Sequence, residues 1–373
     1  MKIIFWISFL VLFYTYIGYP VFLLLYGLAI RKERNKDSQF EPDISMIIPV
    51  YNEETIIKRK VENKLSLDYP KEKLEVLFVS DASTDGTNDI INQFKDTGVS
   101  LFVLTERTGK AGALNRGLKE TKHEIIVFSD ASIMLAPDAL NKIVQRFNND
   151  EIGCISGEDH IPGGGGEGTY GKYELFLRNI ESHAGSIVGA SGCFYAQRRI
   201  LCSSFKEGMA PDFISVLETA EQGYRSITEP EATGTMRRVK RSKKEFERKV
   251  RTLLRGMTTL MHFKHLMNPL RYGLFSFELI SHKILRWSSG IFLFLLFFSN
   301  LFLIKNDIYL LSFILQVVFY TLSMMGWIEI KGLSNKLFVK IPYFFFIVNA
   351  SALIAWVKYF KGLRQEIWEP SKR

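Results

Sequence analysis

Apolar residues along this chain occur in two kinds of run: short ones between residues 44 and 150, and long ones near the two ends. The short runs are β-branched and aromatic. They alternate with segments whose apolar residues recur every three or four positions, as Ile57, Val61 and Leu65 do. The first pattern predicts buried strands and the second predicts amphipathic helices. Four such pairs in about 105 residues predict a doubly wound, parallel α/β sheet. The expected strands are 44–50, 74–80, 99–104 and the stretch 124–132.

Polar residues follow three of these strands at the point where each apolar run stops. The run that ends at Phe128 is followed by Asp130, the second strand ends in Asp81, and the first is followed by Tyr51 and Glu53. Ligands of open α/β sheets lie at the carboxyl ends of the strands. These side chains are therefore candidates for one crevice, although an aspartate there can also shape a turn. Behind Asp81 we expect a tight turn whose Thr87 caps the next helix.

A glycine-punctuated segment, Thr108–Asn115, opens the helix that follows the third strand. Backbone N–H groups at a helix start, with Lys110 beside them, suit a phosphate group. The spacing is not that of a P-loop, because Leu104 stands where the first glycine belongs and Ala111 where a serine or threonine should follow the lysine. The prediction of a phosphate site therefore depends on the polar residues at the neighbouring strand ends and not on a P-loop motif.

The long apolar runs predict membrane helices. Residues 3–30 carry no charge over about 28 positions, more than the roughly 20 that span a hydrocarbon core, and basic residues follow at 31–36. The positive-inside rule places that basic side in the cytoplasm. Residues 284–304 and 308–327 predict a hairpin of spanning helices, and 341–360 is a further apolar segment. If all of them span, basic residues near the C-terminus lie outside, against the same rule, so the count stays at three or four.

The net charge of the chain limits the classes of partner that we expect it to bind. The formal net charge is +9, which suits an anionic membrane face or an anionic substrate. No nucleic-acid-binding motif is present, so nucleic acid is not an expected partner.

Four motifs occur in order and together resemble the membrane-anchored family 2 glycosyltransferases with a GT-A fold. They are IIPVYNEE (47–54), VSDASTDGT (79–87), GKAGALN (109–115) and FSDAS (128–132). The similarity continues through GASGCFYAQRR (189–199), PDF (211–213) and RKVRTLLRG (248–256), and the terminal WEPSKR also looks like this family. The resemblance implies a Rossmann-like domain that transfers a sugar from a nucleotide-sugar donor, with inversion at the anomeric carbon.

The resemblance also implies roles for single residues. Pro49, Tyr51, Glu53 and Asp81 would hold the nucleoside, and Lys110 and Asn115 would lie near the donor. Asp130 would meet the diphosphate through Mg²⁺ or Mn²⁺, which acts as a Lewis acid on such a leaving group. Asp212 would be the general base that takes the proton of the acceptor hydroxyl. Within the basic run 237–251 we assign Arg251 to the diphosphate, with Arg255 just beyond it as the second candidate.

Three positions depart from the family pattern. Ser132 replaces the second acid of the usual Asp-x-Asp pair, and Pro211 stands where another acid often precedes the base. The Gln-x-x-Arg-Trp box of processive synthases is also replaced, by residues 248–252. Losing its glutamine and tryptophan argues against long-chain synthesis, so we expect a non-processive enzyme.

The sequence therefore predicts a transmembrane helix at 1–30, a cytoplasmic GT-A domain at 40–256, interfacial helices at 257–283 and two or three apolar segments within 284–373. We expect a multi-pass protein of the bacterial inner membrane that uses a UDP-sugar and a lipid-linked or membrane-proximal glycan acceptor for surface polysaccharide. The alternatives are a polyprenyl-phosphate sugar synthase, a processive synthase and a non-catalytic sugar-nucleotide-binding subunit.

Overall fold

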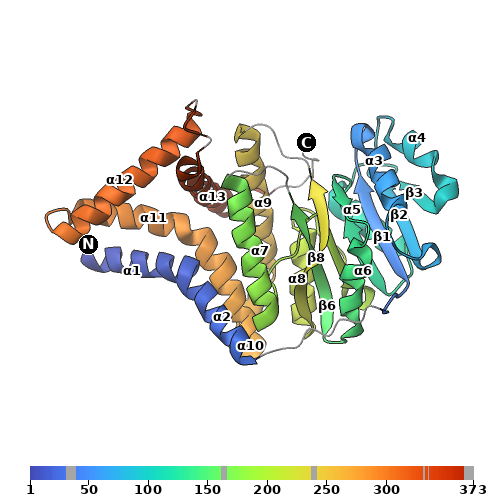
Figure 1. Cartoon of the computed structure of the whole chain (residues 1–373), viewed down its shortest axis with the longest axis horizontal. Helices are drawn as coiled ribbons and strands as arrows, with labels where there is room; N and C mark the ends of the chain where they lie inside the picture. The colour runs from blue at the N-terminus through green and yellow to red at the C-terminus, as the bar shows by residue number, and fades with distance from the viewer. Residues whose placement is uncertain (31–38, 161–165, 237–241, 331, 335, 365–373) are drawn as a thin grey trace.

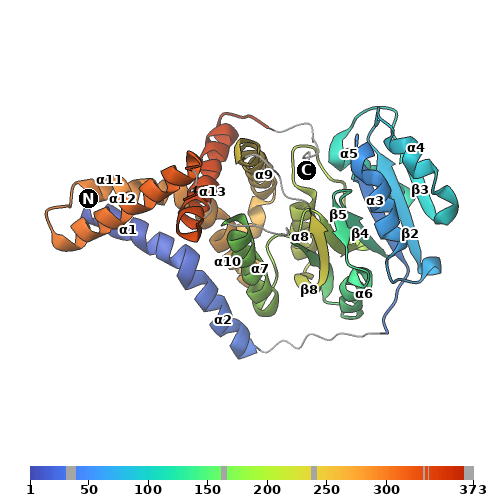
Figure 2. The same ribbon diagram turned by 45° about the horizontal axis from the view of Figure 1, so that its top comes forward.

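The computed structural model describes residues 1–30, 39–160, 166–236, 242–330, 332–334 and 336–364. Figure 1 shows an α/β domain at one end of the molecule and a group of long helices at the other. Two helices, α7 (Gly166–Ala184) and α9 (Ser242–His262), lie between these parts. The turned view in Figure 2 keeps the same order.

One eight-stranded sheet organises the domain, in the order β3-β2-β1-β4-β7-β6-β8-β5. Strands β1 to β4 are mutually parallel, which confirms the predicted sheet, while β7 runs antiparallel to both β4 and β6. The strands are β1 (Ile44–Val50), β2 (Leu74–Ser80), β3 (Val99–Val103), β4 (Ile125–Ser129), β5 (Ile133–Leu135), β6 (Ile152–His160), β7 (Phe194–Arg198) and β8 (Arg225–Met236).

The strand order reverses between β1 and β4, because β2 and β3 lie on one side of β1 and β4 lies on the other. Such a switch point opens a crevice at the carboxyl ends of the two strands. The segment after β1 and Asp130 after β4 border this crevice, as their sequence positions predict.

Helices cover both faces of the sheet and produce two apolar cores. One core includes Ile57 and Val61 of α3 together with Leu140 of α6, and the other includes Leu114 of α5 and Val216 of α8. The short helix α4 does not begin as the sequence predicts, because Gly86 and not Thr87 occupies its N-cap. The helices are α3 (Glu54–Leu65), α4 (Thr87–Asn92), α5 (Gly109–Glu120), α6 (Ala139–Val144) and α8 (Pro211–Glu221).

Within the part of the chain that the structure describes, four helical segments are long and apolar enough to cross a membrane: 2–30, 269–301, 307–327 and 337–360. Many of their large apolar side chains are exposed, as Ile3, Phe294 and Leu311 are, which is unusual for a protein surrounded by water alone. The elements are α1 (Lys2–Phe13), a π-helical turn (Tyr14–Gly18), α2 (Tyr19–Ile30), α10 (Pro269–Leu279), a second π-helical turn (Ile280–Leu285), α11 (Arg286–Leu301), α12 (Asp307–Trp327) and α13 (Leu337–Phe360).

The helix boundaries differ in two places from the segments expected from sequence. Helix α9 continues to His262, across the expected end of the domain at 256, and the second apolar helix begins at Pro269 instead of 284. The basic residues at 31–36 and the terminal WEPSKR lie outside the described residues.

An ionic cluster joins the domain to the membrane helices. His282 and Arg286 contact Glu174 of α7, with N···O distances of 3.5 and 2.5 Å, and His282 also contacts Glu181 at 2.6 Å. The hydroxyl of Tyr19 on α2 donates to Glu181 at 2.7 Å. Burial acts to raise the pKa of Glu174, but Arg286 and His282 hold it well below its ordinary value. Three elements distant in sequence therefore share one charged contact.

Candidate functional site

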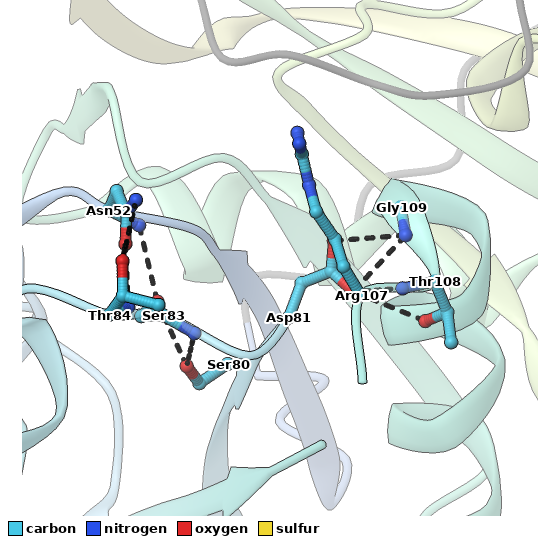
Figure 3. A network of polar contacts seen from close by, with 8 residues as sticks. All are labelled: Asn52, Ser80, Asp81, Ser83, Thr84, Arg107, Thr108 and Gly109. Atoms are coloured by element: carbon cyan, nitrogen blue, oxygen red, sulfur yellow. Dashed lines mark hydrogen bonds and ion pairs between the residues drawn. The ribbon is translucent and has the colours of Figure 1, made fainter. Parts of the chain in front are cut away.

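Asp81, at the end of β2, is completely buried and binds the start of helix α5. The backbone N–H groups of Thr108 and Gly109 donate to its carboxylate, with N···O distances of 2.6 and 2.9 Å, and Arg107 lies 3.9 Å away (Figure 3). A carboxylate at a helix N-terminus satisfies N–H groups that have no partner within the helix. Asp81 thus fixes the glycine-punctuated segment beside the crevice.

The segment after β1 is held by a second polar group, visible on the other side of Figure 3. The side-chain oxygen of Asn52 accepts the N–H of Thr84 at 2.8 Å, and the N–H of Asn52 donates to Ser83. Asn52 has a φ of 51°, a left-handed conformation that asparagine tolerates better than most residues. These contacts join the ends of β1 and β2.

The other predicted nucleoside residues lie along this strand end. Pro49 is buried within β1, and the ring of Tyr51 lies under Arg107, whose guanidinium carbon is 3.9 Å from the ring centroid. The N–H of Glu53 donates to the Thr87 hydroxyl at 2.9 Å, so Thr87 joins the segment after β1 to the start of α4. Tyr51 and Arg107 together present a flat, cationic surface at the crevice.

Lys110 and Asp130 form the ion pair at the centre of the crevice. Lys110 Nζ lies 2.5 Å from Asp130 Oδ1 and also donates to the carbonyl of Gly192 at 3.0 Å. Burial lowers the pKa of Lys110, but Asp130 outweighs it, so the net pKa lies above the ordinary value. The lysine is therefore a cation that already faces the position where a donor phosphate is expected.

Asp212 approaches the same place from helix α8, where it stands in the first turn directly after Pro211. A Cβ added to Gly192 would lie 3.7 Å from the Asp212 carboxyl carbon, so glycine leaves room beside this acid. Burial raises the pKa of Asp212 above its ordinary value of 3.8, against the opposing charges of Lys110, Arg255 and Lys283. A carboxylate with a raised pKa accepts a proton more readily, as a general base must.

Lys60 of α3 is a site-supporting residue that sequence analysis does not single out. It is 1% exposed, and its Nζ donates to the hydroxyl of Ser129 at 2.8 Å and to the carbonyl of Ile133 at 2.7 Å. These two residues flank the turn that contains Asp130. Lys60 therefore holds both sides of that turn. Its position three residues after Ile57, on the same apolar face of the helix, is the sequence signal that could have identified it.

Two predicted residues are not brought into this group. Both ends of the Asn115 amide bind the backbone of Phe205, each at 2.8 Å, so this side chain anchors the segment before α8. Arg251 lines a separate pocket of about 300 Å³ between α9 and α13, together with Glu247 and Lys358. Arg255, one turn further along α9, is the arginine that acts electrostatically on Asp212, and its guanidinium donates to the carbonyl of Met209 at 2.5 Å.

The candidate ligands for a metal ion at the crevice are Asp130 and Ser132. No group of three histidine, cysteine, aspartate or glutamate side chains occurs within the part of the chain that the structure describes. Asp130 offers one carboxylate that is 22% exposed, and Ser132 lies two residues further on. Mg²⁺ is commonly bound by one or two carboxylates together with substrate phosphates and water, so this set fits a metal that arrives with a diphosphate.

Comparison with known proteins finds a family model and relatives that match the α/β domain. Residues 45–202 match the model of glycosyl transferase family 2. The poly-beta-1,6-N-acetyl-D-glucosamine synthase of Staphylococcus aureus (strain COL) is 31% identical over 159 residues, 38% of this chain and 38% of that protein. The synthase of the same name from Staphylococcus epidermidis is 28% identical over 200 residues, 47% of this chain and 48% of that protein. The chain thus matches less than half the length of these relatives.

A solved structure resembles nearly the whole chain. A mannosyltransferase from Pyrobaculum calidifontis, in complex with GDP-Man and Mn²⁺, has a TM-score of 0.73 and 23% sequence identity, covering 96% of this chain and 99% of that one. At this identity the likeness establishes the fold, and the predicted GT-A architecture is confirmed.

Proposed function

We propose that this chain, which carries a glycosyl transferase family 2 domain at residues 45–202, transfers a sugar from a nucleotide-sugar donor to an acceptor at a membrane surface. The observation that carries the proposal is the meeting of Lys110, Asp130 and Asp212 around Gly192. One acid faces the expected diphosphate and the other is a buried base, which are the two roles that an inverting displacement requires.

In the proposed reaction, the acceptor hydroxyl gives its proton to Asp212 as its oxygen attacks the anomeric carbon. The bond from that carbon to the diphosphate breaks, and the nucleoside diphosphate leaves with the electron pair. A single displacement inverts the anomeric centre. A positioned base typically contributes about 10²- to 10⁴-fold to such a step.

Lys110 is the proposed phosphate-binding cation. When a donor enters, the Lys110 ammonium can release the Asp130 oxygen and bind a phosphate oxygen instead. Asp130 is then available to bind a metal ion. Asp130, with Ser132 nearby, would hold Mg²⁺ or Mn²⁺ there. Such an ion, when bound, supplies positive charge to the leaving diphosphate.

The nucleoside is proposed to bind along the end of β1, against Pro49, Tyr51 and Glu53. Asp81 can also bind the nucleoside there, while its hydrogen bonds with the N–H groups of Thr108 and Gly109 position the start of α5. We propose a UDP-sugar as donor, and the GDP-Man bound by the structural neighbour makes guanosine donors the first alternative to include. Asn115 and Arg251 are assigned less directly: Asn115 shapes the donor side through Phe205, and Arg251 reaches the diphosphate only if α9 or its side chain moves.

The four candidate spans and the exposed apolar helices support a multi-pass membrane protein. We propose that its domain lies in the cytoplasm, that its acceptor is lipid-linked or membrane-proximal, and that it adds single sugars for a surface polysaccharide. The missing Gln-x-x-Arg-Trp box supports this non-processive mode.

The test is nucleotide release by the full chain in detergent, with a panel of UDP- and GDP-sugars and either Mg²⁺ or Mn²⁺. We expect turnover with one donor, a loss of at least about 100-fold in Asp212→Asn and in Asp130→Asn, and no change in Asp150→Asn, whose side chain is fully exposed. Full activity of Asp212→Asn would overturn the assignment of the base, and nucleotide binding without release under every condition would support a binding subunit instead.

A further inference from the structure

Lys283 lies near Asp212, and the proposed reaction assigns no role to it. It belongs to the π-helical turn Ile280–Leu285 inside the apolar segment 269–301. Its Nζ lies 5.2 Å from the ring centroid of Phe213, the residue after Asp212, and 5.8 Å from that of Trp287. A Cβ added to Gly189 would come within 3.0 Å of this nitrogen. A lysine from a membrane helix thus reaches the proposed base.

Its two charged neighbours on the same helix behave differently. His282 and Arg286 face α7 and pair there with Glu174 and Glu181. Among the described residues, Lys283 makes no direct ion pair and no hydrogen bond, and its ammonium lies near the rings of Phe213 and Trp287. A π-helical turn changes the direction of successive side chains, and such turns are frequent at functional sites. Here it directs Lys283 to the side of Asp212.

The charges around Asp212 point to the kind of ligand. Three cations, Lys110, Arg255 and Lys283, act on the Asp212 carboxylate, and Asp130 is the acid that pairs with Lys110. Glu174 and Glu181 also act on Lys283, but each of them pairs directly with His282 or Arg286. Lys110 is paired with Asp130 and Arg255 donates to a backbone carbonyl, so among these three cations Lys283 is the one that the described residues leave without a direct polar partner. A cation partly withdrawn from water is stabilised by an anion. Lys283 belongs to a candidate membrane span, whereas Lys110, which we assign to the donor diphosphate, belongs to α5.

We propose that Lys283 binds a phosphate group of the acceptor, and that this phosphate is borne by a lipid. The inference depends on the proposed function, because it assigns the acceptor side of the same site. The lipid source is favoured by position: the helix that carries Lys283 continues into the exposed apolar residues Ile291, Phe294 and Phe298, along which an acyl or prenyl chain can lie. The phosphate then stays at the level of Asp212, where the reacting hydroxyl must be.

The test measures binding and therefore does not require turnover. Decyl phosphate, decanol and glycerol 3-phosphate are titrated calorimetrically into the full chain in detergent. We expect decyl phosphate to bind at least about 10-fold more tightly than either of the others, since it alone combines the charge with the chain. Lys283→Gln should weaken decyl phosphate binding by about 10-fold or more, and Lys283→Arg should keep most of it.

Lys305→Gln is the matched control, because Lys305 is an exposed lysine at the opposite end of α11, and it should bind like wild type. Equal binding of decyl phosphate by wild type and Lys283→Gln would overturn the proposal, as would equal binding of decanol and decyl phosphate. Tighter binding of glycerol 3-phosphate would overturn the lipid source. Failure of the proposed transferase would instead appear as absent nucleotide release in wild type with the Lys283-dependent binding intact.

Discussion

Replacing Lys60 with methionine tests whether a buried ammonium supports the turn that carries Asp130. Methionine keeps the unbranched apolar stem and removes the two hydrogen bonds to Ser129 and Ile133. Each buried group left without a partner costs about 1–3 kcal/mol, so the loss from the two groups is roughly 2–6 kcal/mol. The same substitution also removes a charge from the interior, which acts in the opposite direction.

The balance between these effects depends on pH. Burial lowers the pKa of Lys60 from 10.5 to about 7. Between these values the unfolded chain holds one proton more at this side chain than the folded chain, so folded stability rises with pH, by about 1.4 kcal/mol per pH unit. Below pH 7 both states are protonated and the slope disappears. Wild type should therefore gain roughly 2–3 kcal/mol between pH 6 and pH 9 from this residue.

The assay is thermal unfolding of the full chain in detergent at pH 6 and pH 9. Lys60→Met should be more destabilised relative to wild type at pH 9 than at pH 6, because it lacks that gain. Lys58→Met, at an exposed position on the same helix, should follow wild type at both pH values. A Lys60→Met deficit of equal size at pH 6 and pH 9 would refute the reasoning.

Three further outcomes are expected. The acidic limb of the pH profile of kcat/KM should have its midpoint above 3.8, since burial raises the pKa of Asp212, and Asp212→Asn should lose that limb; a midpoint at or below 3.8 contradicts the assignment. Asn115→Ala should lower stability by about 1–3 kcal/mol in thermal unfolding, with a smaller effect on donor KM, because it frees the backbone of Phe205; the reverse pattern would mean direct donor contact. Arg286→Met should cost about 3–5 kcal/mol by leaving Glu174 poorly paired, and an unchanged unfolding temperature would count against this.

The elements of the sheet could be predicted because each is a local pattern. The apolar runs of β1, β2 and β4 stop where the strands stop, and the acids behind them lie at the crevice. Lys60 was missed because a lysine is normally read as solvent-exposed, and only the surrounding apolar spacing contradicts that reading. The contacts of Asp81 with Thr108 and of Asn115 with Phe205 could not be predicted, since they join residues 27 and 90 positions apart.

The acceptor side of the site was the hardest part to predict from sequence, because it also depends on contacts between residues that are distant in the chain. Lys283 stands in a run that reads simply as membrane helix, and its neighbours His282 and Arg286 look equivalent to it. Only the packing of α7 against this helix separates two paired charges from one that faces Asp212.

The ionic cluster of Glu174, Glu181, His282 and Arg286 bears on how this protein can be cut or recombined. Chimeras that graft the α/β domain onto foreign membrane helices would leave the buried carboxylate of Glu181 and the partly buried one of Glu174 without their basic partners. A water-soluble truncation would expose the same carboxylates next to an apolar face that α2 now covers. The apolar helices and the α/β domain are therefore one structural unit, and an exchange between relatives should carry α2, α7 and the segment 280–286 together.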